Sequence, residues 1–197
     1  MRLPPGSSAN KKGLTLIEAL ISLLIIGVVM AGLCVTLTIG ETSRSISTVQ
    51  VDLQANVRQV LDTVARDFRQ TISWEIANNA PSTTYAKFRP VEGWDTASDT
   101  LLLGGNYTEY SYNAAATRLT RNILNSAGTV ISSRSFYNIT AAPFYTVDIS
   151  DNSIVPLTSA ALLGSGRVVV AVTGAGLARQ GRTLNYTLTE EVKVRNE

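Results

Sequence analysis

The feature that most constrains this chain is a run of 22 uncharged, mostly apolar residues from Ala19 to Gly40. As a helix it would reach roughly 33 Å, enough to cross the hydrocarbon core of a bilayer. Lys11 and Lys12 precede it, and the positive-inside tendency places that end in the cytoplasm. The run is longer than the apolar part of a cleaved secretory signal, and no small-x-small cleavage site follows it. We therefore expect a single-pass membrane anchor, with the chain after Gly40 outside the cytoplasm.

Two residues distinguish this anchor from an ordinary one. Gly13 separates the lysines from the apolar run, and Glu18 lies at the start of the run, where a carboxylate costs a few kcal/mol unless it finds a partner. Cleavage after Gly13 would create a new amine on Leu14, and this amine on one subunit could pair with Glu18 of its neighbour. Alternatively, Glu18 extends toward the membrane interface from its position near the helix end. Taken alone, Glu18 supports the two interpretations equally.

Taken together, these residues are more specific. The string KKGLTLIEAL, residues 11–20, followed by an apolar run, resembles the amino-terminal signature of type IV prepilins and type II secretion pseudopilins. The resemblance implies that a membrane prepilin peptidase cuts after Gly13 and methylates the amine of Leu14. It also implies that Glu18, at the fifth mature position, guides docking into a fibre. The first mature residue of the family is usually phenylalanine, whereas here it is Leu14.

After Gly40 the pattern becomes amphipathic. Apolar residues recur at steps of three and four from Ile46 to Ile72, with charged and amide side chains between them. No proline or glycine interrupts residues 41–77, and Asn78-Asn79-Ala80-Pro81 stops the pattern. We expect one helix from about Leu14 to Ala77, roughly 95 Å long. A coiled-coil partner could produce the same apolar stripe, but the strands that follow favour packing within the chain.

The remainder reads as strands and turns. The predicted strands are residues 100–103, 108–112, 118–123, 130–136, 144–149, 168–173 and 183–194. In the last of these, one parity is apolar and should face the helix: Leu184, Tyr186, Leu188, Val192 and Val194. The predicted fold class is thus α+β, a long amino-terminal helix packed on a β-rich, pilin-like head. The predicted divisions are a leader (1–13), the transmembrane half of the helix (14–40), its amphipathic half (41–80) and the head (81–197).

The layout also resembles the larger minor pseudopilins and the large minor pilins. The segments that carry this finer resemblance are Val64–Arg69, Leu119-Thr120-Arg121, and the basic residue and asparagine near the end, Arg195-Asn196.

Catalytic chemistry has little support. The chain has no histidine, and its one cysteine, Cys34, lies in the apolar run, which excludes imidazole bases, His-ligated zinc and Cys–His nucleophiles. Leu33 before Cys34 does not fit a lipoprotein signal, which needs a small residue there. The glycines of 164–166 and 174–176 match no dinucleotide or phosphate-loop fingerprint and are interpreted as turns. We expect no enzyme and no cofactor.

A weak calcium site is the one metal candidate. Asp148, Asp151 and Asn152 could supply oxygen ligands to Ca²⁺, but they lack a bidentate glutamate at fixed spacing. A solvated turn is the favoured interpretation of these three residues.

The functional prediction is a minor pilin or pseudopilin, a structural subunit that helps prime a type IV pilus or a secretion pseudopilus. Its expected partners are other pilins or pseudopilins and the prepilin peptidase, and its location is the cytoplasmic membrane and then the fibre. Three of the 17 basic residues lie in the leader, so a nucleic-acid surface is not expected. The alternatives are a tip adhesin, a DNA-uptake pilin or a plain signal-anchored binding domain. Five aromatic residues could serve adhesion or belong to the core: Trp74, Trp94, Tyr107, Tyr110 and Tyr112.

Overall fold

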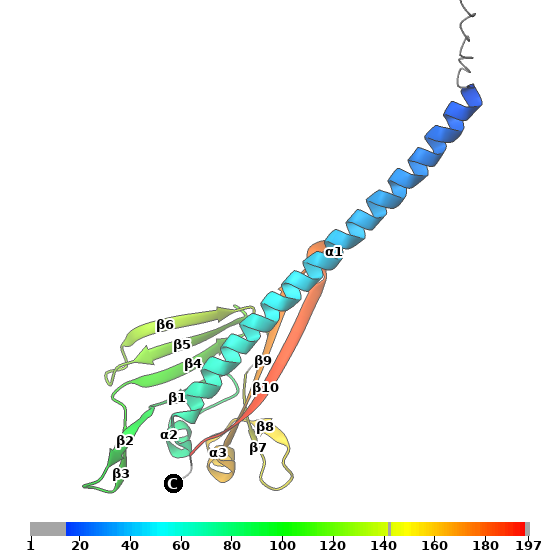
Figure 1. Cartoon of the computed structure of the whole chain (residues 1–197). Coiled ribbons are helices and arrows are strands. Elements are labelled where there is room, and N and C mark those ends of the chain that lie inside the picture. The colour runs from blue at the N-terminus through cyan, green and yellow to red at the C-terminus, as the bar shows by residue number, and fades with distance from the viewer. Residues whose placement is uncertain (1–14, 142, 196–197) are drawn as a thin grey trace, which may run out of the picture. The chain divides into compact units, whose positions relative to one another are not determined.

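The computed structural model describes residues 15–141 and 143–195, and Figure 1 shows the arrangement of its elements. The helices are α1 (Leu16–Arg69), α2 (Ser73–Ala77) and α3 (Ser159–Ser165), with a short 3₁₀ turn at Arg179–Gly181. The strands are β1 (Tyr85–Phe88), β2 (Val91–Asp95), β3 (Thr100–Leu103), β4 (Tyr107–Asn113), β5 (Arg118–Leu124), β6 (Val130–Tyr137), β7 (Phe144–Val147), β8 (Ile154–Pro156), β9 (Arg167–Leu177) and β10 (Thr183–Lys193). A long apolar helix followed by antiparallel sheets confirms the α+β class and the β-rich head.

The chain divides between Arg44 and Ser45 into two units, which we describe separately. In the first unit, the large apolar side chains of α1 are exposed, from Leu16 at 83% to Ile39 at 64%. Such side chains need an apolar surrounding that their own unit does not provide. By length and composition, α1 is a helix that could cross a membrane.

The second unit contains two four-stranded antiparallel sheets and a hairpin. The first sheet has the strand order β1-β4-β5-β6, the second has the order β10-β9-β7-β8, and β2 pairs with β3 alone. In the first sheet β4, β5 and β6 follow one another in the chain and pair in that order. Strand β1 pairs with the other edge of β4. In the second sheet β9 and β10 pair along their whole length, with Val172 opposite Leu188.

The second half of α1 packs on both sheets. Its buried apolar residues recur at three- and four-residue steps, as an amphipathic helix requires: Leu53, Val57, Val60, Leu61, Val64 and Phe68. Phe68 is fully buried, and its ring centre lies 4.9 Å from that of Phe88 in β1 and 5.7 Å from that of Phe144 in β7. Because β1 and β7 belong to different sheets, one aromatic side chain of the helix contacts both.

The prediction of one helix through Ala77 is wrong, because α1 ends at Arg69 and α2 begins at Ser73. Between them Ile72 is extended, with φ −118° and ψ 154°, and forms a bridge with Arg195. The backbone groups released by the break find partners elsewhere: the Gln70 carbonyl accepts from Val91 N–H at 2.6 Å, and Ser73 N–H donates to the Arg195 carbonyl at 3.0 Å. The β-branched pair Thr71-Ile72 suits this extended conformation.

Strand prediction succeeded where alternation was strong. All seven predicted segments contain a strand, although β7 ends at Val147 rather than Ile149. Strands β1, β2 and β8 and helix α3 were not predicted. The predicted parity of β10 is confirmed: Val192 and Val194 are buried, and Leu184, Tyr186 and Leu188 pack against the core.

The interpretation of residues 174–176 as a turn is also wrong, because they lie inside β9. A Cβ on Gly174 would lie 2.7 Å from Val57 Cγ2 and 2.8 Å from Leu53 Cδ1, and a Cβ on Gly176 would lie 2.7 Å from Val49 Cγ1. The two glycines therefore allow α1 to approach the strand closely. Gly166, in contrast, ends α3 in the left-handed conformation, with φ 61°.

We predict that Leu188→Asp destabilises the head by about 2 kcal/mol or more, because its charge would lie on the face of β10 that packs against the core. Thr189→Asp is the matched control, since Thr189 is the next residue and is exposed. The measurement is urea unfolding of the full chain in detergent. Equal stability of the two variants would contradict the orientation of β10.

We also predict that Gly174→Ala lowers the free energy of unfolding by about 1–3 kcal/mol, because the added methyl group forces α1 and β9 apart. Gly105→Ala is the control, because a Cβ on Gly105 meets nothing within 4 Å. Thermal melting of both variants should separate them. A Gly174→Ala protein as stable as Gly105→Ala would show that the helix yields without cost.

Candidate processing and assembly site

Glu18 closes the first turn of α1 on itself. The Thr15 carbonyl accepts the first helical hydrogen bond, from Ala19 N–H at 3.1 Å, so Thr15 is the N-cap residue. Thr15 N–H and the Thr15 hydroxyl each donate to Glu18 Oε2 at 2.9 Å, and Glu18 N–H donates back to the Thr15 hydroxyl oxygen at 3.4 Å. This reciprocal pattern is a capping box. It satisfies helix N–H groups that would otherwise lack partners.

The capping box was missed at the level of sequence, although its signal is present. Thr15-Leu16-Ile17-Glu18 fits the pattern of a threonine followed three residues later by a glutamate, directly before an apolar run. From the sequence, Glu18 either pairs with a neighbour's amine or extends toward the membrane interface. The structure adds a third possibility, because Glu18 accepts hydrogen bonds from Thr15 of its own helix.

The carboxylate still has a second oxygen to offer. Both bonds from Thr15 end on Oε2, and no N–H or O–H group of the described residues donates to Oε1 of Glu18. An ionised carboxylate can accept several hydrogen bonds. Capping the helix and pairing with an external cation are therefore compatible roles. The other two predicted processing residues, Gly13 and Leu14, lie outside the described residues.

The calcium candidates form the turn between β7 and β8. Asp148 accepts from both the N–H and the hydroxyl of Ser150, which lowers the pKa of this carboxyl, and Asp151 accepts from Ser153 N–H. Asn152 takes the left-handed conformation, with φ 56°. These bonds are those of a self-supporting turn. Over residues 15–141 and 143–195, no three histidine, cysteine, aspartate or glutamate side chains gather as a metal site would require.

Two of the three segments with the finer resemblance meet inside the head, whereas Asn196 of the third lies outside the described residues. Asp67 of α1 is buried, accepts from Arg121 Nε of β5 at 2.6 Å, and accepts from the Tyr110 hydroxyl at 2.7 Å. Burial, and then the charge of Asp67, raise the pKa of Tyr110. This pair joins residues 64–69 to residues 119–121, which are far apart in sequence. A second ion pair, Glu75 with Arg89 at 2.8 Å, holds α2 to the segment after β1. Both pairs hold the head together rather than perform chemistry.

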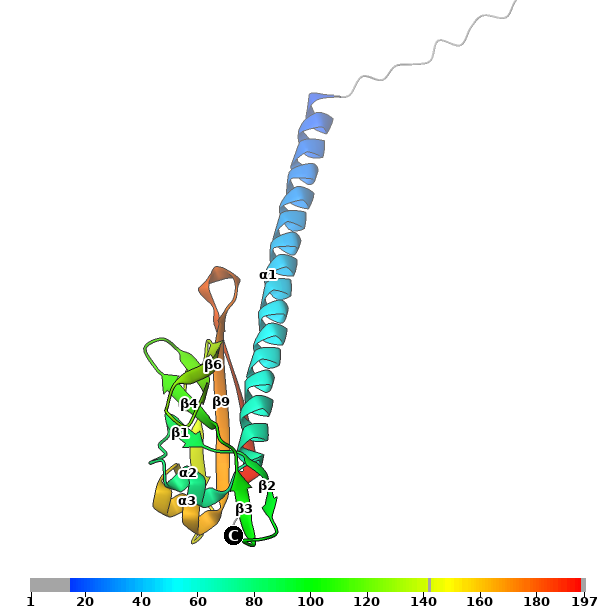
Figure 2. The same ribbon diagram turned by 90° about the vertical axis from the view of Figure 1, so that its left-hand side faces the viewer.

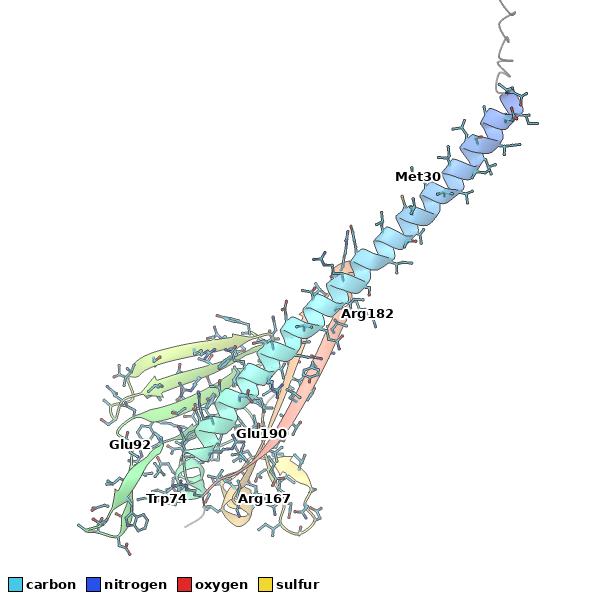
Figure 3. The ribbon with its side chains drawn as sticks, in the orientation of Figure 1. Met30, Trp74, Glu92, Arg167, Arg182 and Glu190 are labelled. Carbon is cyan, nitrogen blue, oxygen red and sulfur yellow. The ribbon has the colours of Figure 1, made fainter. Side chains whose placement is uncertain are left out.

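The aromatic candidates for adhesion divide into two groups. Tyr110 is fully buried and belongs to the core, and Tyr112 packs against that core. Trp74 and Trp94 are 39% and 46% exposed, on α2 and β2. Figure 3 labels Trp74 at the end of the head that carries α2. Tyr107, in β4, is half-buried, with Lys87 Nζ 4.6 Å from its ring centre. Because Tyr110 and Tyr112 belong to the core region, the five residues do not form one aromatic surface.

The comparisons with known proteins bear on the amino-terminal segment. The family model of the prokaryotic N-terminal methylation motif matches residues 8–33, a range that includes Gly13, Leu14 and Glu18. This match supports a type IV prepilin-like protein, which confirms the resemblance drawn from residues 11–20. Proteins with this motif are structural, and the long apolar helix fits anchoring in the inner membrane. No curated protein and no solved structure matches the chain.

We predict that the mature chain begins at Leu14 and carries a methylated amine. The reason is the position of Gly13 between two lysines and the apolar run, inside the matched motif. Mass spectrometry of the protein extracted from membranes is the measurement, and Gly13→Ala should leave uncut protein in the membrane. A terminus at Met1, or within residues 31–33, would contradict processing as a prepilin.

Proposed function

We propose that the protein is a minor pilin or pseudopilin, a non-enzymatic subunit that helps prime a type IV pilus or a type II secretion pseudopilus. The observation that carries this proposal is the geometry of Glu18, which caps its own helix through Oε2 and has no donor to Oε1 among the described residues. A carboxylate at this depth costs a few kcal/mol unless it is paired, which makes Glu18 a candidate for a functional role. The matched methylation motif supports the same class of protein.

The proposed sequence of events follows from the resemblance and from chain connectivity. Prepilin peptidase removes residues 1–13 and leaves a methylated amine on Leu14, one residue before the cap. Amines and carboxylates gain most from pairing where water is scarce. The amine of one subunit then pairs with Oε1 of Glu18 in the next, while the exposed apolar side chains of residues 16–39 pack between neighbouring helices.

We further propose that the subunit lies just below the fibre tip and has a partner ahead of it. By resemblance, the outermost pseudopilin often lacks the membrane glutamate, since it meets no amine, whereas this chain keeps Glu18. The adhesin alternative loses Tyr110 and Tyr112, which belong to the core region, and keeps Trp74 and Trp94, which are exposed but lie on different elements.

Three variants separate capping from assembly. Glu18→Gln keeps a side chain that can close a capping box but loses the charge. Thr15→Ala loses the cap hydroxyl and keeps the charge. Glu18→Ala loses both the capping group and the charge. We predict that Glu18→Gln and Glu18→Ala leave insertion and cleavage intact while capture by other minor subunits falls severalfold. Thr15→Ala should retain most of the capture.

The measurement is crosslinking in whole cells from a photoreactive residue at position 41, just beyond the apolar run. Equal crosslinking of the wild type and Glu18→Gln would show that the charge has no role in assembly. In that case Glu18 would be only a capping residue, and the placement below the tip would lose its support.

A further inference from the structure

The turn between β9 and β10, residues 178–182, is held at a defined height on α1. Arg179 N–H donates to the Ser45 hydroxyl oxygen at 3.2 Å. Three residues before Arg179, within β9, Gly176 lies so close to α1 that a Cβ there would be 2.7 Å from Val49 Cγ1. These two contacts fix the β9–β10 turn beside Ser45, within the second unit. Figure 2 shows the turn at one end of the head, opposite the end with α2, α3 and the β2–β3 hairpin.

Ser45 lies close to the apolar run in the chain. It follows Gly40, the last residue of that run, by five helical residues, a rise of about 7.5 Å. The interfacial layer on each side of a bilayer is roughly 5–8 Å thick. If residues 14–40 span the membrane, as the proposed function requires, the five residues from Gly40 to Ser45 keep Ser45, and the turn bonded to it, within reach of the lipid headgroups.

The chemistry of the turn suits that level. Leu177, the last residue of β9, is 70% exposed. Arg182, which follows in the turn, is exposed, and no acidic residue lies between Gly174 and Thr189. Figure 3 labels Arg182, which lies just before β10, well apart from Glu190 near the other end of that strand.

We propose that the β9–β10 turn binds the phosphate groups of phospholipids in the outer leaflet. A guanidinium such as that of Arg182 can donate two parallel hydrogen bonds to a phosphate. Leu177 supplies apolar surface for the boundary between headgroups and acyl chains. The turn makes this contact while residues 14–40 span the membrane.

The test uses the full chain with Cys34→Ser and Thr183→Cys, labelled with an environment-sensitive fluorophore at the exposed position 183. The protein is reconstituted in vesicles of phosphatidylglycerol and phosphatidylcholine that contain a lipid with a spin-labelled headgroup. We expect strong quenching at position 183. The matched control carries the fluorophore at position 149. Ile149 is 64% exposed and lies beside Gly164 of α3, at the end of the head opposite the β9–β10 turn, and quenching there should be severalfold weaker. Equal quenching at the two positions would overturn the proposal.

A charge reversal tests the phosphate contact itself. Arg182→Glu should lower quenching at position 183 by about half or more in vesicles with phosphatidylglycerol. Lys193→Glu is the control, because Lys193 is exposed at the far end of the same strand, and it should leave the quenching unchanged. The same loss in both variants, or in neither, would show that no local contact with phosphate exists.

Extraction with alkaline carbonate separates this inference from the proposed function. If the chain leaves the vesicles, residues 14–40 do not span the membrane and both proposals fail. If the chain stays and position 183 is not quenched, the span stands and the lipid contact alone is wrong. Crosslinking of position 183 to a second subunit in the membrane, in place of quenching, would likewise overturn the lipid contact and assign the turn to a protein neighbour.

Discussion

The packing of Phe68 between two sheets is the interaction on which the head depends. Its ring is fully buried and contacts Phe88 and Tyr110 of the first sheet and Phe144 of the second. Removing a buried aromatic ring of this kind costs about 3–5 kcal/mol, a large part of the stability of a small domain. The adjacent Asp67 adds the pair with Arg121, so consecutive helix residues supply both apolar and ionic contacts to the strands. The second half of α1 is therefore an internal element of the head, not a stalk attached to it.

This arrangement also explains the break after Arg69. Phe68, Ile72 and Ile76 follow one another at four-residue steps and are all fully buried, so the apolar period continues across a point where the helix does not. Periodicity in the sequence cannot reveal such a break. What ends the helix is tertiary: the Gln70 carbonyl and Ser73 N–H bond to Val91 and Arg195, residues that approach only in the folded chain. Tertiary partners here override a helical pattern.

Other elements were predictable where residues close in the sequence determine the local structure. β10 alternates strictly, and its orientation followed from that alternation. β2 contains Glu92 and Gly93 at a register shift, which breaks the period of two and hides the strand. The glycines of β9 were misread because a glycine in a turn and a glycine under a helix look alike in sequence. For the candidate site, Glu18 was found through its position before the apolar run. Its bond to Thr15 is local enough to have been predicted, whereas the Asp67–Arg121 pair spans 54 residues and was not.

The capping box changes the energetic argument for Glu18. A bare carboxylate at membrane depth would cost a few kcal/mol until a neighbour's amine arrived. Bonds from Thr15 and the positive end of the helix dipole already offset part of that cost in the isolated subunit. The first N–H groups of a helix in lipid also need partners, and the same carboxylate supplies one. The capped glutamate therefore does not depend on a neighbour's amine for its stability. In the assembly proposed above, pairing of Glu18 with an amine selects a correctly placed neighbour rather than rescuing an unstable helix.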